Sequence, residues 1–441
     1  MGNAESQPVR NVDKRTARRD FAHLFKGALT RYRQNVLVDG GGAAAEGPVP
    51  VDWEDRGGRH LRIAVRRRPI FPHETNAGEF DVVTCTPTEV TIHDCRMHPD
   101  CRRLYVGHNS FDFDRVYDQH ASSRDVYQGS VAPLVRLATV AKAATVLMYG
   151  QTGSGKTFTM RAIFEAAAVD LFGAIDVANG DRVTLAYAEL GPGGARDMLN
   201  GGASASLLAD HAGDTQIVPS LEVAVTSAEG LVGLLEFASS LRATSATGVH
   251  DASSRSHAIA RIAVQRAADD AGKVGMLTLV DLAGSEMRID SDKHDAKRTK
   301  ESAMINSSLM ALKDSVRALA RGKEWGLLAG RSPLTKVLKA SFVGADSHCL
   351  VLATVSPASK VRRAPAIPDL ALSRSFFPCF LPCAHTLSLL LPPRTRSTRS
   401  TRCATRASWT GSRTRRRRAR SRGRRAGGRS RKTSGRSIRR R

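Results

Sequence analysis

The feature that most constrains this 441-residue chain is a glycine-rich octapeptide between an apolar run and a helical segment. It consists of Gly150-Gln151-Thr152-Gly153-Ser154-Gly155-Lys156-Thr157 and matches the pattern G-x-x-x-x-G-K-[ST]. The glycines let backbone N–H groups turn inward around phosphate oxygens, and the start of the following helix adds positive partial charge. Lys156 would reach the terminal phosphates and Thr157 would bind Mg²⁺. The octapeptide therefore predicts a site for a nucleoside triphosphate.

Strand-like and helix-like segments alternate around this loop. Strands are predicted over residues 61–65, 145–149, 183–190, 258–265, 276–280 and 348–355. Helices are predicted over residues 131–143, 158–172 and 305–319, and another is predicted to begin at Ser332-Pro333. Such alternation indicates an α/β domain of the P-loop NTPase class, with a parallel or mixed sheet.

Two further motifs follow the loop along the chain. The first is Ser253-Ser254-Arg255-Ser256-His257, and the second is Asp281-Leu282-Ala283-Gly284-Ser285-Glu286, directly after an apolar strand. An aspartate at the end of a strand beside a phosphate loop is placed to hold the water shell of Mg²⁺. Gly284 would let a backbone N–H approach the terminal phosphate. Together the two motifs predict the parts that sense a bound nucleotide.

With these three motifs in this order, residues 61–357 resemble the kinesin motor domain. The resemblance implies a central mixed sheet flanked by helices on both faces. It also implies hydrolysis of ATP with Mg²⁺ and binding to microtubules, in the cytoplasm and on the cytoskeleton.

Individual roles also follow from the resemblance. Arg66, Arg68 and Pro69 would flank the adenine, with Tyr127 nearby. Ser253 and Ser254 would contact the γ-phosphate and Mg²⁺, and Asp281 would hold the waters of the metal. Arg255 and Glu286 would form an ion pair around the attacking water.

Three features are most similar to the kinesin-13 proteins, which depolymerise microtubule ends. Leu312 is followed by Lys313-Asp314-Ser315, where that family has Lys-Glu-Cys. Residues 1–58 are predicted to be a basic neck or linker that is largely disordered or helical. They precede a motor domain predicted at residues 59–358. Residues 93–109 form a predicted polar insertion with His98-Pro99-Asp100 in place of a Lys-Val-Asp finger. The basic side chains expected to meet tubulin's acidic surface are Lys293, Lys297, Arg298, Lys300, Lys313, Arg317, Lys336 and Lys339.

Two departures from the family leave other functions open. His250 replaces the asparagine three residues before Ser253, and the finger retains only its acidic residue. A conventional stepping kinesin and a catalytically weakened microtubule-binding scaffold are therefore alternatives to a depolymerase. No heptad repeat extends beyond the predicted motor domain, so the pattern favours no particular oligomeric state.

Charge divides the chain into two parts. Of 67 Lys+Arg and 42 Asp+Glu, residues 360–441 hold 25 basic residues and one acid, which leaves 42 basic and 41 acidic residues in 1–359. Binding to nucleic acid would therefore rest on the tail alone and is disfavoured. For this Arg/Ser-rich tail, taken as residues 359–441, we favour translation of a retained intron followed by a frame change. The alternative is a disordered basic arm that binds RNA or tubulin tails.

Three weaker patterns concern metals, membranes and redox state. His93, Cys95, His98 and Cys101 suit zinc chemically, but their nine-residue span leaves no hairpin between ligand pairs, so a polar loop is favoured. The N-terminal pattern at Gly2 fits N-myristoylation, and nearby basic residues would add a second membrane signal. No run reaches the roughly 18 apolar residues of a membrane span. Seven scattered cysteines favour reduced thiols.

Overall fold

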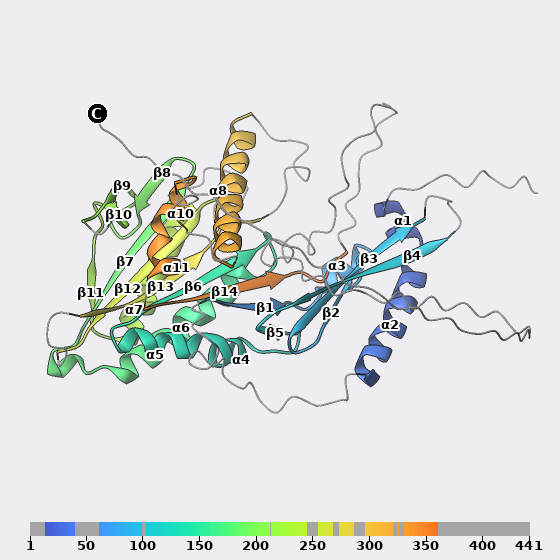
Figure 1. The fold of residues 1–441 in the computed structure, drawn as a ribbon, viewed down its shortest axis with the longest axis horizontal. Helices are drawn as coiled ribbons and strands as arrows, with labels where there is room; N and C mark the ends of the chain where they lie inside the picture. Colours follow the sequence, from blue (N-terminus) through green and yellow to red (C-terminus); the bar gives the residue numbers. More distant parts are fainter. Residues whose placement is uncertain are drawn as a thin grey trace, which may run out of the picture. The chain divides into compact units, whose positions relative to one another are not determined.

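The computed structural model describes residues 14–39, 61–98, 103–211, 213–244, 255–267, 273–285, 296–320, 325, 330–344 and 346–359. Most of these residues build one large sheet with helices on both faces (Figure 1). In spatial order its strands are β10 (Thr215–Val218), β9 (Ala203–Ala209), β8 (Gly194–Asp197), β7 (Arg182–Gly191), β12 (His257–Gln265), β13 (Val274–Asp281), β6 (Ala143–Gly150), β14 (Ser347–Val355), β1 (Leu61–Arg67) and β5 (Arg115–Tyr117). A further strand, β11 (Val223–Val225), pairs with β7.

The sheet is parallel at its centre and antiparallel toward one edge. Strand β6 runs parallel to both β13 and β14, and β14 runs parallel to β1. Strand β12 is antiparallel to β13 and to β7. The predicted mixed sheet is therefore confirmed. In the parallel register Asp281 lies opposite Met148 and Thr354 lies opposite Gly150, so three carboxyl ends meet at one edge, where open α/β sheets place their ligands.

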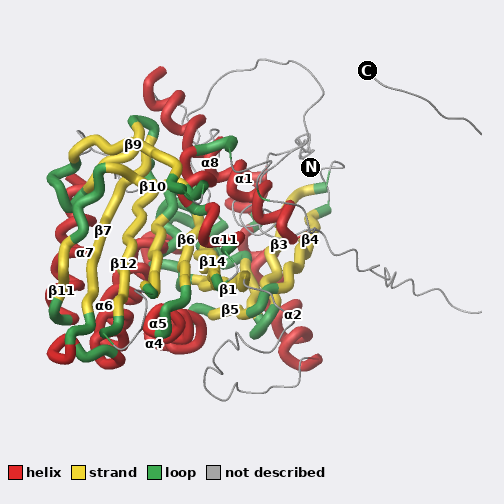
Figure 2. The backbone as a smooth tube through the Cα atoms, turned by 60° about the vertical axis from the view of Figure 1, so that its left-hand side comes forward, coloured by secondary structure: helices red, strands yellow, loops and turns green. Residues whose placement is uncertain are grey.

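Helices cover the two faces of this sheet (Figure 2). One face carries α4 (Ser123–Val126), a π-helical turn over Tyr127–Val131, α5 (Ala132–Thr139), α6 (Lys156–Ala174) and α7 (Ala228–Thr244). The other carries α8 (Ala296–Ala320), α10 (Pro333–Val337) and α11 (Lys339–Val343), and a short α3 (Pro72–Asn76) follows β1. Predicted strands and helices thus recur here, with two differences. The helix predicted over residues 131–143 ends at Thr139, and the helix predicted to begin at Ser332-Pro333 is broken at Leu338 between α10 and α11.

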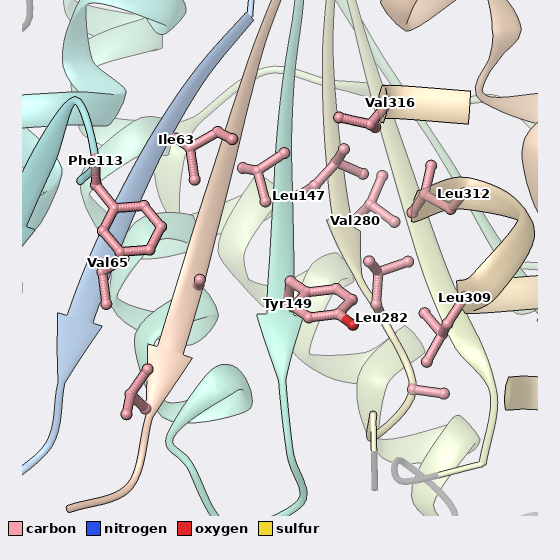
Figure 3. Close-up of a cluster of buried hydrophobic side chains, with 14 of the residues drawn as sticks. Ile63, Val65, Phe113, Leu147, Tyr149, Val280, Leu282, Leu309, Leu312 and Val316 are labelled. Atoms are coloured by element: carbon pink, nitrogen blue, oxygen red, sulfur yellow. The ribbon is translucent and has the colours of Figure 1, made fainter. Parts of the chain in front are cut away.

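Alternation along the central strands separates two apolar cores. On β6, Leu147 and Tyr149 belong to the core beneath α8, whereas Val146 and Met148 belong to the core beneath α5, α6 and α7. Figure 3 shows the first core, where side chains of α8 lie against those of β6 and β13. The sequence predicts one apolar stripe on this helix, made of Ile305, Leu309, Leu312, Val316 and Leu319. The first four are confirmed as its buried face, and the side chain of Leu319 lies outside the described residues.

A second, three-stranded sheet occupies the region predicted to be a polar insertion. It consists of β2 (Val83–Cys85), β3 (Glu89–Met97) and β4 (Leu104–Asp112), with antiparallel pairing throughout. The prediction of a loop was wrong because the polar side chains of β3 find partners inside the fold. His93 contacts Thr84 Oγ1 through Nε2 and His108 Nδ1 through Nδ1, each at 2.8 Å. Within the described residues no group of three or more His, Cys, Asp or Glu could hold a metal ion, and Cys101 lies outside them.

Two N-terminal helices, α1 (Lys14–Asp20) and α2 (Ala22–Asp39), lie beside this second sheet (Figure 1). Arg18 is 4% exposed and donates to Cys95 O at 3.2 Å, Ser359 O at 3.0 Å and Asp94 Oδ1 at 3.2 Å. Farther along, Phe25 of α2 is buried in the same core as α8 and β6. Part of the segment predicted to be a neck therefore contributes to the core of the domain predicted at 59–358.

Helix α2 also covers the histidine pair of the second sheet. The Tyr32 ring stacks on His108 with centroids 4.2 Å apart and meets His93 edge-on at 4.8 Å. Arg33 donates from Nε to Thr84 Oγ1 at 3.1 Å. The groups that contact the His93 ring here, Tyr32, Thr84 and His108, are uncharged and would not stabilise its protonated form.

Acid is expected to weaken this contact. Burial, together with His108 and the cations Arg33 and Arg67, lowers the pKa of His93 from 6.5 to about 3. Between these values the unfolded chain binds a proton that the folded chain does not, so stability falls as the pH drops below 6.5. The thermal midpoint should therefore fall further between about pH 7.5 and about pH 5.5 in the wild type than in His93→Gln. Equal pH dependence in the two proteins would contradict the prediction.

No helix in the described part of the chain is both long enough and apolar enough to cross a bilayer. The pattern at Gly2 and the tail from residue 360 onward lie outside that part, so their interpretations stay predictions.

Candidate functional site

The phosphate loop joins the end of β6 to the start of α6, as the sequence predicts. Gly150 ends the strand, and a Cβ there would lie 2.5 Å from Thr354 Oγ1 and 2.6 Å from Thr354 O. Gly153 and Gly155 have positive φ angles of 77° and 103°, and Gly155 is the N-cap of α6. These positions require glycine because a side chain would clash at the first and strain the backbone at the others.

The side chains of the loop hold it in a turned-in conformation. Lys156 is 7% exposed, and its Nζ donates to Gly150 O at 3.0 Å and Gln151 O at 3.1 Å. Ser154 Oγ donates to Gln151 O at 2.6 Å and contacts Thr354 Oγ1 at 2.7 Å. The ammonium group is therefore fixed inside the loop, and the exposed Thr152 lies between these anchored residues. A loop of this form concentrates positive charge where phosphate groups bind.

Asp281 and Thr157 meet although 124 residues separate them in sequence. Thr157 Oγ1 donates to Asp281 Oδ2 at 3.2 Å. The other oxygen, Asp281 Oδ1, is buried without a hydrogen-bond partner in the structure. A hydroxyl next to a carboxylate with an unused oxygen is a donor set that suits Mg²⁺ and its waters. Thr157 and Asp281, two of the three predicted metal-site residues, thus lie together and their chemistry fits the ion, whereas the third, Ser254, lies outside the described residues.

A buried arginine that the sequence analysis missed supports Asp281 from behind. Arg242 on α7 is 4% exposed and donates from Nη1 to Asp281 Oδ2 at 3.4 Å. It also donates from Nε to Ser256 Oγ at 3.0 Å and from Nη2 to Ser256 O at 2.6 Å. Arg242 therefore joins the motif at 253–257 to the motif at 281–286. Arg242 belongs to neither motif. Only its place on a helix that precedes the motif at 253–257 could have suggested its role.

The segment after Asp281 lies along the phosphate loop. Ser285 N donates to Gly150 O at 3.1 Å, and Ala283 N donates to Nδ1 of His257 at 3.1 Å. Burial and the positive charges of Arg242 and Lys156 lower the pKa of His257 to about 3, so the ring is neutral. Gly284 lies between these two bonded residues, where its backbone was predicted to approach a γ-phosphate.

Arg66 and Arg68, which are predicted to flank the adenine, lie beside the loop and the first turn of α6. Arg66 donates to Thr159 Oγ1 at 2.9 Å, and Arg68 donates from Nε to Gly153 O at 2.8 Å. Pro69 is exposed and accepts a hydrogen bond from Arg68 Nη1 at 2.8 Å. The sequence analysis missed Phe158, whose ring is 70% exposed with the Arg66 guanidinium 5.5 Å from its centroid. An exposed aromatic ring directly after Thr157 offers a surface on which a base can stack.

Tyr127 does not contribute such a surface. Its ring is 4% exposed within the core beneath α5 and α6, and its hydroxyl donates to Asp170 Oδ2 at 2.7 Å. The ring instead stabilises the contact between the π-helical turn and α6, and its nearness to the adenine stays a prediction. Of the remaining predicted residues, Arg255 is half-buried, whereas His250, Ser253, Ser254 and Glu286 lie outside the described residues.

The kinesin motor domain model matches residues 66–364 of this chain, which include every motif above. The chain belongs to the kinesin motor family. The diatom spindle kinesin-1 of Cylindrotheca fusiformis is 39% identical over 301 residues, which cover 68% of this chain and 47% of that protein. The kinesin-like protein KIN-13B of Arabidopsis thaliana is 33% identical over 307 residues, which cover 68% of this chain and 44% of that protein.

Solved kinesins share the fold. The structure of a fast kinesin superposes with a TM-score of 0.59 and 28% identity, and the match covers 68% of this chain and 86% of that one. Kinesin motor domains as a family are ATPases. This kinesin chain spans about half the length of the curated relatives that it matches.

Among the described side chains of the basic surface predicted to meet tubulin, Lys339 and Lys313 have surroundings that the sequence did not indicate. Lys339 pairs with Asp214 at 3.2 Å and also donates to Gly213 O. Burial, with Arg317 nearby, lowers the pKa of Lys313. Lys300 and Lys336 are exposed and Arg317 is half-buried, whereas Lys293 and the side chains of Lys297 and Arg298 lie outside the described residues.

Proposed function

We propose that this kinesin hydrolyses ATP on microtubules and uses the reaction to disassemble microtubule ends, as kinesin-13 proteins do. The observation that carries the hydrolytic part is the contact between Thr157 and Asp281, with Asp281 Oδ1 buried and unpaired. When bound, Mg²⁺ supplies charge neutralisation at the phosphate oxygens. The chain's own groups bind and orient the nucleotide: loop N–H groups and Lys156 hold phosphates, and Phe158 stacks on the base.

The outward face of α8 supports microtubules as the partner. Its exposed residues at helical spacing are Lys300, Met304, Ser307 and Met310, and the two methionines are 54% and 58% exposed. Flexible methionines beside a cation form an adaptable surface for a protein partner with acidic groups. We infer that this face contacts tubulin while the opposite face packs on the sheet.

The second sheet supports the depolymerase part of the proposal. Strands β3 and β4 lead to and from the finger position, and His98 N donates to Arg103 O at 2.7 Å where the described strands end. Helices α1 and α2 pack against this hairpin through the buried Arg18 and through Tyr32. The hairpin of β3 and β4 is held in place by these contacts, and we infer that it can therefore bind a curved tubulin end as a rigid element. Pro99 and Asp100 of the finger lie outside the described residues.

One assay separates the depolymerase from its alternatives. Purified full-length chain is added with ATP to stabilised microtubules, and single filaments are followed by fluorescence microscopy. Shortening from the ends, with ATP consumed, supports the proposal. Gliding of filaments would favour a stepping kinesin, and decoration without turnover would favour a scaffold. Lys156→Ala, which removes the buried loop ammonium, serves as the nucleotide-site control.

Loosening the N-terminal helices is expected to slow end disassembly without changing ATP hydrolysis in the absence of tubulin. Arg18→Met keeps the length of the side chain but removes its buried bonds, at a cost of about 3 kcal/mol in the free energy of unfolding. The matched control is Arg19→Met, because the neighbouring Arg19 side chain is 59% exposed. We expect Arg18→Met to shorten microtubules several-fold more slowly than Arg19→Met. Equal shortening rates for the two variants would show that the contact between Arg18 and the β3–β4 hairpin has no role in end disassembly.

A further inference from the structure

Thr354 lies against the phosphate loop, near the carboxyl end of β14. In the parallel pairing of β14 with β6 it is opposite Gly150, where the loop begins. Thr354 is 1% exposed, and its Oγ1 lies 2.7 Å from Oγ of Ser154, which is 2% exposed. Two buried hydroxyl groups, 200 positions apart in sequence, therefore join the last central strand to the middle of the loop.

The direction of this hydrogen bond follows from the protons available. Each hydroxyl group has one proton to donate. Ser154 Oγ donates to Gln151 O at 2.6 Å, so it accepts from Thr354 Oγ1. The other acceptor within reach of Thr354, Tyr149 O, is farther away at 3.4 Å. Thr354 thus orients the Ser154 hydroxyl group, which in turn holds the carbonyl group of Gln151.

Two carbonyl groups of the loop are held by donors of this kind. Gln151 O accepts from Ser154 N at 3.2 Å as well as from Ser154 Oγ. Gly153 O accepts from Arg68 Nε at 2.8 Å, and Arg68 Nη2 donates to Ser356 Oγ at 2.8 Å. A loop binds phosphate through its N–H groups, so carbonyl oxygens that are engaged elsewhere leave those groups better placed for an anion. The end of β14 and the residue after it support the turned-in form of the loop at two neighbouring points.

The consequence of such support is a preorganised loop. A loop that already has its binding form gives a higher affinity, because the nucleotide does not have to order it. The loop encloses the phosphates that ADP and ATP have in common, so weaker support should lower the affinity for both nucleotides alike. Interactions that hold the substrate and the transition state equally change KM and leave kcat unaltered. These two features distinguish a group that shapes the loop from one that senses the γ-phosphate.

We propose that Thr354 is a positioning residue that fixes the phosphate loop in its binding form through Ser154. This inference deepens the nucleotide site of the proposed function and rests on it. Thr354 is assigned no contact with the nucleotide, and it acts through the hydroxyl group of Ser154 alone.

The test separates the hydroxyl group of Thr354 from its packing. Thr354→Val keeps the shape of the side chain and removes the donor, whereas Thr354→Ser keeps the donor and removes a methyl group. We expect Thr354→Val to raise the Kd of fluorescent ADP and ATP analogues, and the KM for ATP, by about five- to tenfold. The kcat should stay within about twofold of the wild type. Thr354→Ser should bind both analogues within about twofold of the wild type, although its thermal midpoint falls.

The matched control is Thr145→Val. Thr145 is also a buried threonine, 2% exposed, and it lies toward the other end of the pairing between β6 and β14. Its affinity for both analogues should equal that of the wild type. A double variant of Thr354→Val with Ser154→Ala should bind nucleotide no more weakly than Ser154→Ala alone, because the two residues act in series.

Three results would overturn the inference and leave the proposed function standing. They are wild-type affinity in Thr354→Val, a loss of affinity for ATP without one for ADP, and additive losses in the double variant. Weak binding in Thr354→Ser with wild-type binding in Thr354→Val would likewise assign Thr354 to packing. Failure of the wild type to bind either analogue would instead contradict the proposed function, and the inference with it.

Discussion

Asp281→Asn is expected to lower ATP turnover by about two to three orders of magnitude, the range seen when one preorganised polar group is removed from an active site. The amide cannot both accept from Thr157 and offer an anionic oxygen to the waters of Mg²⁺. It also leaves Arg242, which is 4% exposed, without the negative charge that faces it. Steady-state turnover at saturating Mg-ATP measures the first effect. Fluorescent-nucleotide binding with and without a chelator should show that affinity no longer depends on Mg²⁺.

The control for this variant is Asp170→Asn. Asp170 is an exposed aspartate on α6 that accepts from Tyr127, so the same chemical change is made outside the nucleotide site. Its turnover should match that of the wild type. If Asp281→Asn also retained turnover within about threefold of the wild type, Asp281 would have no role in holding the metal.

Glu286→Ala is expected to leave ATP binding within about threefold and to abolish steady-state hydrolysis. The family resemblance pairs Glu286 with Arg255 around the attacking water, and that pair would form only with ATP bound. Glu286 lies outside the described residues, whereas Arg255 precedes the buried Ser256. Binding is measured with a fluorescent analogue and turnover by phosphate release. Wild-type turnover in Glu286→Ala would exclude the pair.

Arg255→Ala should reproduce this behaviour, because an ion pair is lost with either partner. The double variant should then be no slower than either single variant, since residues that act as a unit have non-additive effects. Additive losses would show that the two side chains act separately.

The nucleotide site was predictable from sequence where a motif and a buried strand coincide. Strand β6 is covered on both faces and therefore appears as a continuous apolar run ahead of Gly150. The stripe from Ile305 to Val316 likewise predicted which face of α8 is buried. At Ser332 the predicted helix start is confirmed by a capping box with Thr335, although the helix ends sooner than its apolar residues suggest.

The errors arise where polar residues are buried by partners distant in sequence. His93 belongs to β3, but its partners Thr84 and His108 come from two other strands, and no local pattern shows this. Arg18 lies in a basic stretch that predicts exposure, yet Asp94 and two carbonyl groups make its burial possible. The role of Arg242 likewise depends on tertiary packing, because its helix brings it beside Asp281 from outside both motifs.

The bond from Arg18 to Ser359 O has a mechanical consequence. These two residues lie 341 positions apart in sequence, near the first and the last described residues. Arg18 nevertheless bonds both Ser359 O and Asp94. Tension applied to the chain at either flank would therefore be divided between β14 and α1 rather than carried by one element. In this motor domain the described segments before β1 and after β14 are therefore joined directly to each other through Arg18.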